Sequence, residues 1–341
     1  MFLLSILLVF YFGSLQADDK VLSDSHGPIS IMGDHIHKKN EFMFSYRLMK
    51  MEMNDILNGT KKININRVMN SPNGASDNSG SYMNSPKKMS MEMHMFGMMF
   101  APSNNLTLML MTSFNNKEMI QQRMPMSGGT NFGVNSSGIG DTRLSSLIKI
   151  VDSTTWKNHF GLGMSFPTGS INERDVTPVS ESSRLGYGMQ QGSGTFDTFF
   201  LFNNVNKIKK FTIGEQIFMK VPSSGKNKNN YRYGNSLDLK FWFSYRFVDY
   251  LSTSVKINYK YMSQMKGSDN EMNKRMSPVL DSYNTGYQKI NLGLGINFVN
   301  NLPVFKNHRL AFEILLPVYQ NLRGIQMSEN YSLIFGWQYG F

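Results

Sequence analysis

The sequence contains no cysteine and only 11 prolines, and charged residues make up just 17% of its 341 positions. The absence of cysteine excludes a disulfide scaffold, a thiolate metal site and a cysteine nucleophile. Aromatic residues, at 13%, argue against disorder. The low charge, the aromatic residues and the 29 glycines together favour β structure. The net charge is +11, a balance that often indicates nucleic acid. We expect the basic residues to line and rim a pore instead, with no nucleic-acid partner.

Long apolar runs are also missing beyond the N-terminus. The run Met1–Ala17 is too short to span a bilayer comfortably and is followed at once by Asp18 and Asp19, which favours a cleaved export signal. No later stretch of about 18 apolar residues predicts a membrane helix. We therefore expect three parts: a signal peptide at 1–17, an N-terminal periplasmic or lumenal segment at 18–40, and an outer-membrane β-barrel at 41–341.

The strongest pattern present is an alternation of apolar and polar residues. Tyr331–Phe341 places aromatic and aliphatic side chains at odd positions and small or polar ones at even positions, and Ser236–Phe247 and Leu251–Tyr261 repeat the pattern with lysine or arginine on the second face. A soluble sheet would not bury such charges repeatedly. An apolar-outside, polar-inside barrel explains both faces. The predicted fold class is therefore all-β, a single transmembrane antiparallel β-barrel of about 12 strands, near 41–53, 88–101, 105–115, 141–152, 158–167, 193–203, 208–221, 236–247, 250–263, 287–299, 308–319 and 330–341.

The connections between these strands alternate in length. Most of those at one end are short, such as 102–104 and 248–249, whereas those at the other end are long, such as 54–87 and 168–192. Outer-membrane barrels have short periplasmic turns and long external loops, so we expect both chain ends on the periplasmic side. The aromatic ending resembles the signal that the barrel-assembly machinery recognises, which predicts that machinery and outer-membrane lipid as partners; its residues are Trp337, Tyr339 and Phe341.

Charged residues on the inward face form the candidate solute pathway. Nine are basic and three acidic, so the predicted lumen is positive and selects anions. The alternative is that these charges form a salt-bridged plug that fills a narrow barrel. The residues are Arg47, Arg143, Lys149, Asp197, Asp238, Lys240, Arg246, Lys256, Lys260, Lys289, Arg309 and Glu313.

The 27 methionines suggest a second role for the interior. The alternation places Met43, Met49, Met51 and Met53 inward, whereas the run MSMEMHM at 89–95 is ambiguous, and we expect Glu92 and His94 inward with Met91, Met93 and Met95 towards lipid. Thioether and imidazole ligands suit cuprous ion, although methionine also serves as a flexible apolar wall. Copper is the one cofactor that this pattern suggests, with the candidate ligands His35, His37, Met43, Met49 and Met51.

Several runs of the sequence are distinctive: HGPISIMGDHIHKKNEFMFSYRLMKMEMN from His26, GIGDTRL from Gly138, FPTGSINERD from Phe166 and the ending FGWQYGF. Over about residues 26–341 the chain resembles a family of Gram-negative outer-membrane β-barrels described as transporters and grouped with the barrels of phenol-degradation (meta) pathways. The resemblance implies a barrel and a transport role, and it supplies no functional residues.

Three functions remain open at this stage. The first is a pore-type transporter that passes small anionic or amphipathic solutes through a basic, methionine-lined lumen. The second is a barrel that binds or handles a soft metal such as copper, and the third is a closed barrel whose loops bind partners. We expect no enzyme, because the sequence lacks Gly-x-Ser-x-Gly, a P-loop and a dinucleotide fingerprint and supplies no activated nucleophile.

Overall fold

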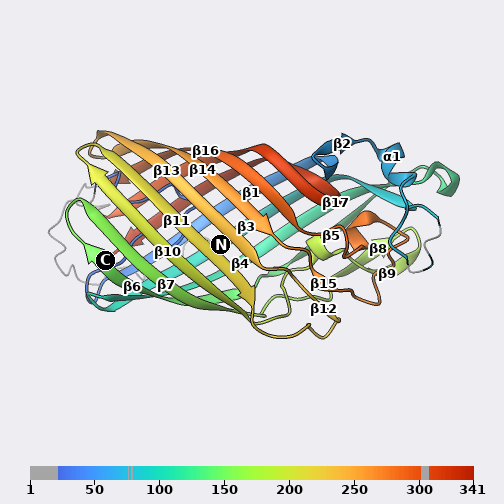
Figure 1. The fold of residues 1–341 in the computed structure, drawn as a ribbon, viewed down its shortest axis with the longest axis horizontal. Coiled ribbons are helices and arrows are strands. Elements are labelled where there is room, and N and C mark those ends of the chain that lie inside the picture. The colour runs from blue at the N-terminus through green and yellow to red at the C-terminus, as the bar shows by residue number, and fades with distance from the viewer. Residues whose placement is uncertain (1–21, 76, 78–79, 301–306) are drawn as a thin grey trace, which may run out of the picture.

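A computed structural model describes residues 22–75, 77, 80–300 and 307–341 of the chain. Within this part, eleven long strands form a closed antiparallel barrel, and pairing of the last strand with the first completes the ring (Figure 1). The strands of the ring are β1 (Phe42–Gly59), β3 (Asn84–Ser103), β4 (Leu106–Arg123), β6 (Thr142–Asp152), β7 (Trp156–Phe166), β10 (Asp197–Ile208), β11 (Phe211–Pro222), β13 (Ser236–Val248), β14 (Leu251–Met262), β16 (Tyr287–Asn300) and β17 (His308–Gly340).

The strand count is close to the expected 12, and the difference lies in β17. The sequence predicts separate strands near 308–319 and 330–341, whereas the structure has one continuous element of 33 residues. Its first part, up to Leu322, pairs with β16, and the part from Leu322 onward pairs with β1, both antiparallel. The chain therefore reverses direction within β17, beside Gly324, whose φ of +69° suits a glycine at a tight turn.

Two further strands, β2 (Lys61–Ile63) and β5 (Asn131–Ile139), bond to the outside of this ring. They gather with the other small elements at the end of the barrel that carries the long loops, whereas the short connections and the C-terminus lie at the opposite end (Figure 1). None of the helices in the described part is long and apolar enough to cross a membrane. The small elements are α1 (Ile65–Met69), η1 (Pro125–Ser127), β8 (Arg174–Thr177), β9 (Ser180–Arg184), η2 (Tyr187–Met189), β12 (Tyr231–Arg232), β15 (Lys266–Gly267) and η3 (Pro278–Leu280).

The outer surface of the ring is apolar. Large hydrophobic side chains are exposed on strand after strand, among them Leu110, Leu162, Phe241, Ile257 and Phe312. Their strand neighbours point to the opposite face, where polar side chains are buried. A closed barrel satisfies every backbone hydrogen bond within the ring, and an apolar exterior requires lipid around it. The fold therefore agrees with the outer-membrane location that the sequence predicts.

One expected face is wrong. The β1–β3 register pairs Arg47 with Met95 and Leu48 with His94, and paired residues share a face of the sheet. Because the buried side chain of Arg47 lies inside the barrel, Met95 and its alternate neighbours also face inward, and Glu92 and His94 face outward. The outward polar groups are satisfied: His94 bonds Glu92 at 3.1 Å and the Tyr46 hydroxyl at 2.8 Å. Alternation within one strand could not reveal this pairing between strands.

Candidate functional site: the plugged lumen

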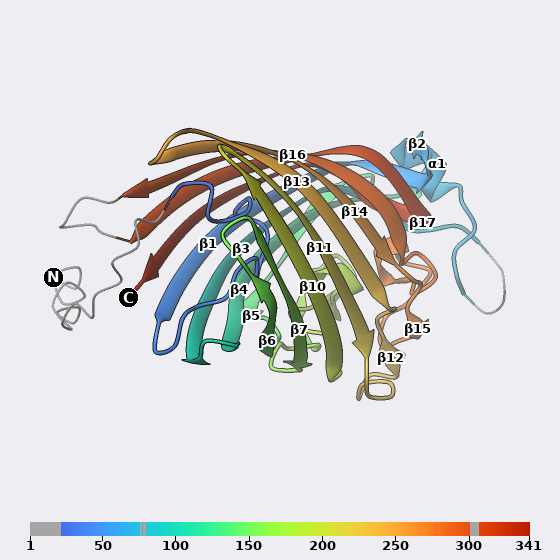
Figure 2. The ribbon, with the colours of Figure 1, turned by 60° about the vertical axis from the view of Figure 1, so that its left-hand side comes forward.

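The chain that precedes β1 occupies the inside of the barrel (Figure 2). We call residues 22–41 the plug. It enters at the end with the short connections, where the Ser23 amide donates to the Asp249 carbonyl at 2.9 Å, and its midpoint is fully covered, since Ile29 and Ile31 are each 1% exposed. Ile29 packs against a wall cluster consisting of Ala311, Leu315 and Ile334. Residues 22–40 of the plug belong to the predicted segment 18–40, and Glu41 follows it. Residues 18–21 and the predicted signal peptide 1–17 lie outside the described residues.

Wall side chains hold the plug by its backbone carbonyls. The guanidinium of Arg47 donates to the Ile29 carbonyl at 2.9 Å, and that of Arg309 donates to the Gly27 carbonyl. Both arginines are among the predicted lumen residues. Three uncharged wall side chains bond further carbonyls of the plug: Gln216 that of Met32 (2.9 Å), His159 that of Gly33 (2.8 Å) and Asn203 that of Asp34 (2.9 Å). The sequence analysis did not select them, although the alternation places them on the inward face.

Buried charges of the wall also meet the plug. Lys256 and Glu313 form an ion pair at 2.5 Å with both side chains fully buried, and the Ser30 amide of the plug donates to Glu313 at 3.0 Å. Nearer the short connections, Asp24 of the plug pairs with Lys207 at 2.9 Å and lies 3.7 Å from Arg246. Three of these side chains, Lys256, Glu313 and Arg246, are predicted lumen residues, and each lies beside an opposite charge of the wall or the plug.

Three other predicted lumen residues pair with charges of the wall. Lys149 pairs with Asp152 at 2.9 Å at the end with the short connections, and Lys289 pairs with Glu329 at 2.8 Å. Asp197 is fully buried and binds Lys220 at 2.7 Å.

Two adjoining cavities lie between the plug and the long loops. Their volumes are about 320 and about 200 Å³. Met32 of the plug and Met95, Met111 and Arg143 of the wall line both cavities. We call the two together the chamber. The rest of its wall is mixed, with Met49, Phe199, Phe218 and Leu201 beside Asn258, Asp238, Lys240 and Lys260 in the smaller cavity, and Met93, Lys117, Asp141, Lys220 and Tyr233 among others in the larger.

The charges of the chamber are mainly basic. Lys240 is paired with Asp238 at 3.3 Å. The side chains of Arg143 and Lys260, by contrast, make no hydrogen bond or ion pair with any residue in the described part of the chain. Both were predicted as lumen residues. They leave the chamber with two cationic groups that are free to contact a bound solute.

The long loops cover the outer side of the chamber. Lys117 of β4 donates to the carbonyls of Gln190 at 2.6 Å and Gly188 at 3.0 Å, which ties the β7–β10 loop to the wall. The Tyr233 hydroxyl donates to the Tyr187 carbonyl at 2.8 Å. Tyr187 is itself buried, which raises its pKa to about 12, so its hydroxyl stays neutral and accepts a hydrogen bond from the Asp269 amide. We call these parts of the β7–β10, β11–β13 and β14–β16 loops, around Tyr187, Tyr233 and Asp269, the loop lid.

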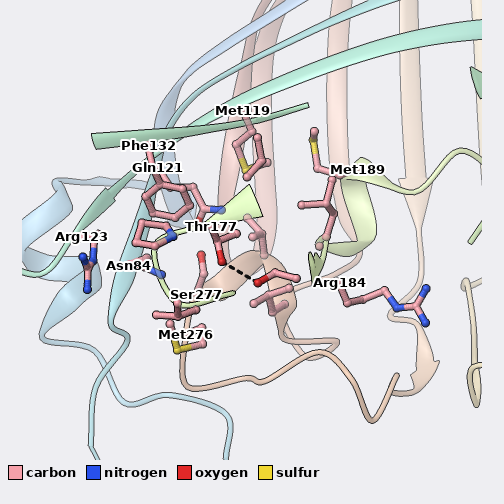
Figure 3. Close-up of a pocket in the computed structure, with 18 residues that line it drawn as sticks. Asn84, Met119, Gln121, Arg123, Phe132, Thr177, Arg184, Met189, Met276 and Ser277 are labelled. Atoms are coloured by element: carbon pink, nitrogen blue, oxygen red, sulfur yellow. Dashed lines mark hydrogen bonds between the residues drawn. The ribbon is translucent and has the colours of Figure 1, made fainter. Parts of the chain in front are cut away.

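A third, smaller cavity lies within the loops (Figure 3). Its volume is about 60 Å³, and its wall combines Met119 of β4, Phe132 of β5, Met189 of η2 and Val279 of η3. The same side chains belong to or pack on a hydrophobic cluster. We interpret this cavity as a packing gap in the loop lid. The side chains around it come from separate loops, which therefore pack against one another here.

The predicted copper ligands are only partly brought together. His35 and His37 approach to 3.2 Å between their Nε2 atoms, and His35 and Met43 line the same small cavity of about 10 Å³. Met49 belongs to the wall of the chamber instead. Met51 is buried and lines neither of these two cavities.

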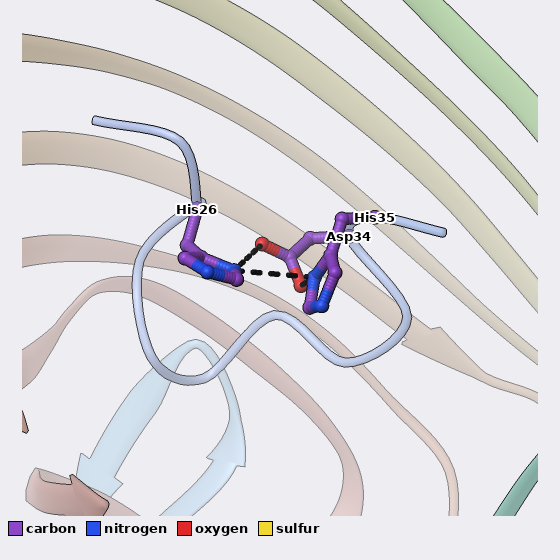
Figure 4. Close-up of side chains that lie close together, drawn as sticks. All are labelled: His26, Asp34 and His35. Atoms are coloured by element: carbon purple, nitrogen blue, oxygen red, sulfur yellow. Dashed lines mark hydrogen bonds and ion pairs between the residues drawn. The ribbon is translucent and has the colours of Figure 1, made fainter. Parts of the chain in front are cut away.

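Two residues that the sequence analysis did not select, His26 and Asp34, lie against His35 (Figure 4). Burial and the neighbouring His35 and Arg309 lower the pKa of His26 well below its usual range. Burial alone would raise the pKa of Asp34, but His35, His26 and Arg309 outweigh it, so that pKa is also lowered well below its usual range. The histidine is thus neutral and the carboxyl ionised. The bend at Gly33, with φ +63°, helps fold the chain back, and sequence spacing does not predict it.

The predicted assembly residues lie at the seam where β17 meets β1. Trp337 donates to His308 at 3.0 Å, and the rings of Tyr339 and His308 stack at 4.4 Å. Phe341 exchanges backbone hydrogen bonds with Phe42 at 2.8 and 2.9 Å. These contacts close the barrel, and recognition by an assembly machinery stays a prediction.

No family model matches the sequence, and no curated protein matches it. Its fold is similar to that of the COG4313 outer membrane channel from Pseudomonas putida F1, with a TM-score of 0.59 at 10% identity over 91% of this chain and 98% of that one. Weaker likenesses include the toluene transporter TodX of P. putida (TM-score 0.42, 9% identity, 90% and 91% covered) and the KdgM porin (0.40, 9%, 88% and 99%). The fold is therefore shared with the COG4313 channel. The phenol-degradation grouping stays a prediction.

Proposed function

We propose that the protein is a gated outer-membrane channel for small amphipathic anions. The observation that carries the proposal is the chamber: methionine and phenylalanine side chains supply an adaptable apolar wall, and Arg143 and Lys260 supply unpaired cations. An apolar body with one anionic group fits both features, because flexible thioethers accommodate different shapes and arginine binds planar oxyanions with two parallel hydrogen bonds.

The plug and the loop lid make the channel gated. Passage from the loop end to the end with the short connections requires the loops to part and the plug to leave its seat, since Ile29 and Ile31 fill the path. The solute moves down its gradient, and the chamber is the site where it rests between the two barriers. A site that binds weakly enough to release its solute still sets the selectivity of a channel.

The test uses two aromatic ions that are permanently charged, benzenesulfonate and phenyltrimethylammonium. Purified full-length protein is placed in liposomes, and the entry of each ion is compared with that into empty liposomes. We expect benzenesulfonate to enter faster. Arg143→Gln should lower the ratio of the two rates by about tenfold, which corresponds to the loss of one charge-assisted hydrogen bond of about 1.5 kcal/mol.

The matched control is Arg67→Gln, which removes an exposed arginine on α1. It should leave the ratio unchanged. Equal entry of the two ions into wild-type liposomes, or equal effects of the two substitutions, would refute the assignment of Arg143. The copper alternative, with His35, His37, Met43, Met49 and Met51 as ligands, stays a prediction that a cuprous-ion titration tests.

A further inference from the structure

The plug contains a cluster of metal-ligating side chains outside the chamber. His26, Asp34 and His35 converge although His26 and His35 lie nine positions apart in the chain (Figure 4). The Nδ1 atoms of the two histidines are 3.2 Å apart. Asp34 approaches the Nδ1 atom of His35 with Oδ1 at 2.8 Å and that of His26 with Oδ2 at 3.8 Å.

These distances suit one tetrahedral ion. Bonds of 2.0–2.1 Å from zinc to imidazole nitrogen or carboxylate oxygen imply about 3.3–3.4 Å between two ligand atoms in a tetrahedron. The two Nδ1 atoms lie 3.2 Å apart, close to that value, and one ligand atom from each of the three residues lies within 4.8 Å of the others. A site with three protein ligands leaves a fourth position for water.

The contacts of His35 with its other neighbours are compatible with a cation bound at its Nδ1 atom. His35 and His37 are linked Nε2 to Nε2 at 3.2 Å, and His37 Nδ1 lies 3.3 Å from Glu41. Asp34, His35, His37 and Glu41 are thus linked by three successive contacts, and each contact needs one proton to be a hydrogen bond. Two neutral imidazoles carry only two ring protons, so one contact would set a lone pair against a lone pair.

A metal ion between Asp34 and His35 removes this conflict. His35 then keeps its proton on Nε2 and donates it to His37, and His37 donates from Nδ1 to Glu41. An imidazole that binds metal with one nitrogen and is oriented through the other by a hydrogen-bonded carboxylate is a common arrangement in metal sites. One additional proton on the imidazoles would also supply the missing hydrogen bond. A proton shared by Asp34 and His35 needs no third ligand, however, whereas His26 Nδ1 points to the same place, as a metal ligand would.

We propose that His26, Asp34 and His35 bind one first-row divalent transition-metal ion, with His37 and Glu41 as positioning residues. Imidazole with carboxylate suits Zn²⁺, Cu²⁺ or Ni²⁺, and the predicted cuprous set of methionines is not involved. The ion ties residues 26–35 into a closed loop. Because Ile29 and Ser30 lie within that loop and contact the wall, the bound ion stabilises the seated plug.

The experiment is a calorimetric titration with Zn²⁺ of full-length protein that carries no polyhistidine tag and has been stripped with a chelator. We expect one ion per chain. His26→Gln and His35→Gln should each weaken binding at least tenfold, and His37→Gln by about 10-fold or more through the loss of the orienting contact. His94→Gln is the matched control: it removes a histidine that bonds a glutamate on the outer face and should leave affinity unchanged.

A second measurement reports the ligands directly. Electron paramagnetic resonance of the Cu²⁺-loaded protein should show coupling to two imidazole nitrogens, and to one in either His26→Gln or His35→Gln. Circular dichroism of each variant establishes that the barrel is folded. Absence of Zn²⁺ binding by the wild type, or equal affinity in the His26→Gln and His94→Gln variants, would overturn the site. Either result is independent of the transport experiment, so the two proposals fail separately.

Discussion

Arg47→Met tests whether the plug is the gate. The guanidinium of Arg47 donates to the Ile29 carbonyl at 2.9 Å, whereas methionine keeps an apolar stem of similar length and donates nothing. In the seated plug the Ile29 carbonyl would then be buried without a partner, at a cost of about 1–3 kcal/mol, and in the released plug water would satisfy it. Since about 1.4 kcal/mol is tenfold in an equilibrium constant, the released fraction should rise about 5- to 150-fold.

The assay is single-channel recording in planar bilayers, in which the open probability reports the released fraction. Gly336→Val perturbs the same seat sterically, because a Cβ atom at Gly336 would overlap the Ile29 side chain. It should also raise the open probability. Two matched controls should not: Lys62→Met breaks an exposed pair with Asp55, and Gly133→Val adds a side chain where no atom lies within 4 Å. If all four variants open as rarely as wild type, Ile29 is not part of a gate.

Three further perturbations test other parts of the account. Lys117→Met leaves the carbonyls of Gly188 and Gln190 without their donor and should make the β7–β10 loop cleave several-fold faster in limited proteolysis, while an unchanged rate would mean that the loop lid does not depend on this contact. Lys256→Met leaves Glu313 charged and buried without its partner and should lower the free energy of unfolding by about 3–5 kcal/mol, with recovery in the double variant Lys256→Met, Glu313→Leu; a double variant as unstable as the single one would contradict this reasoning. Removal of Phe341 should reduce the yield of folded barrel in membranes several-fold, measured by heat-dependent gel migration, and an unchanged yield would refute its role as an assembly signal.

The strands could be predicted from the sequence because a barrel between lipid and lumen imposes a period of two on each of them. The segments predicted near 236–247 and 250–263 correspond to β13 and β14 within one or two residues. The prediction was less accurate where strands continue beyond the ring, since β4 extends to Arg123 and pairs there with β5. The last two predicted strands form one element because the residues on both sides of the turn at Gly324 stay paired with β16 or with β1.

The interior was less predictable because its contacts join residues that are far apart in the chain. Arg309 lies 282 positions from the Gly27 carbonyl that it binds. The alternation placed basic residues in the lumen but could not distinguish Lys256, which Glu313 neutralises, from Arg143, which stays unpaired in the described part of the chain. The orientation of Met95 depended on its register with Arg47. His26 was missed because only the folded plug brings it to His35.

Conductance after removal of the plug tests the central claim most directly. A variant without residues 22–38 keeps the predicted export signal, every barrel strand and the chamber wall except for Met32 and Ser30. In planar bilayers it should conduct steadily with a reversal potential that indicates anion preference, whereas the full-length protein opens rarely. A truncated barrel that is folded and conducts no more than the full-length protein would contradict the account of a plugged channel.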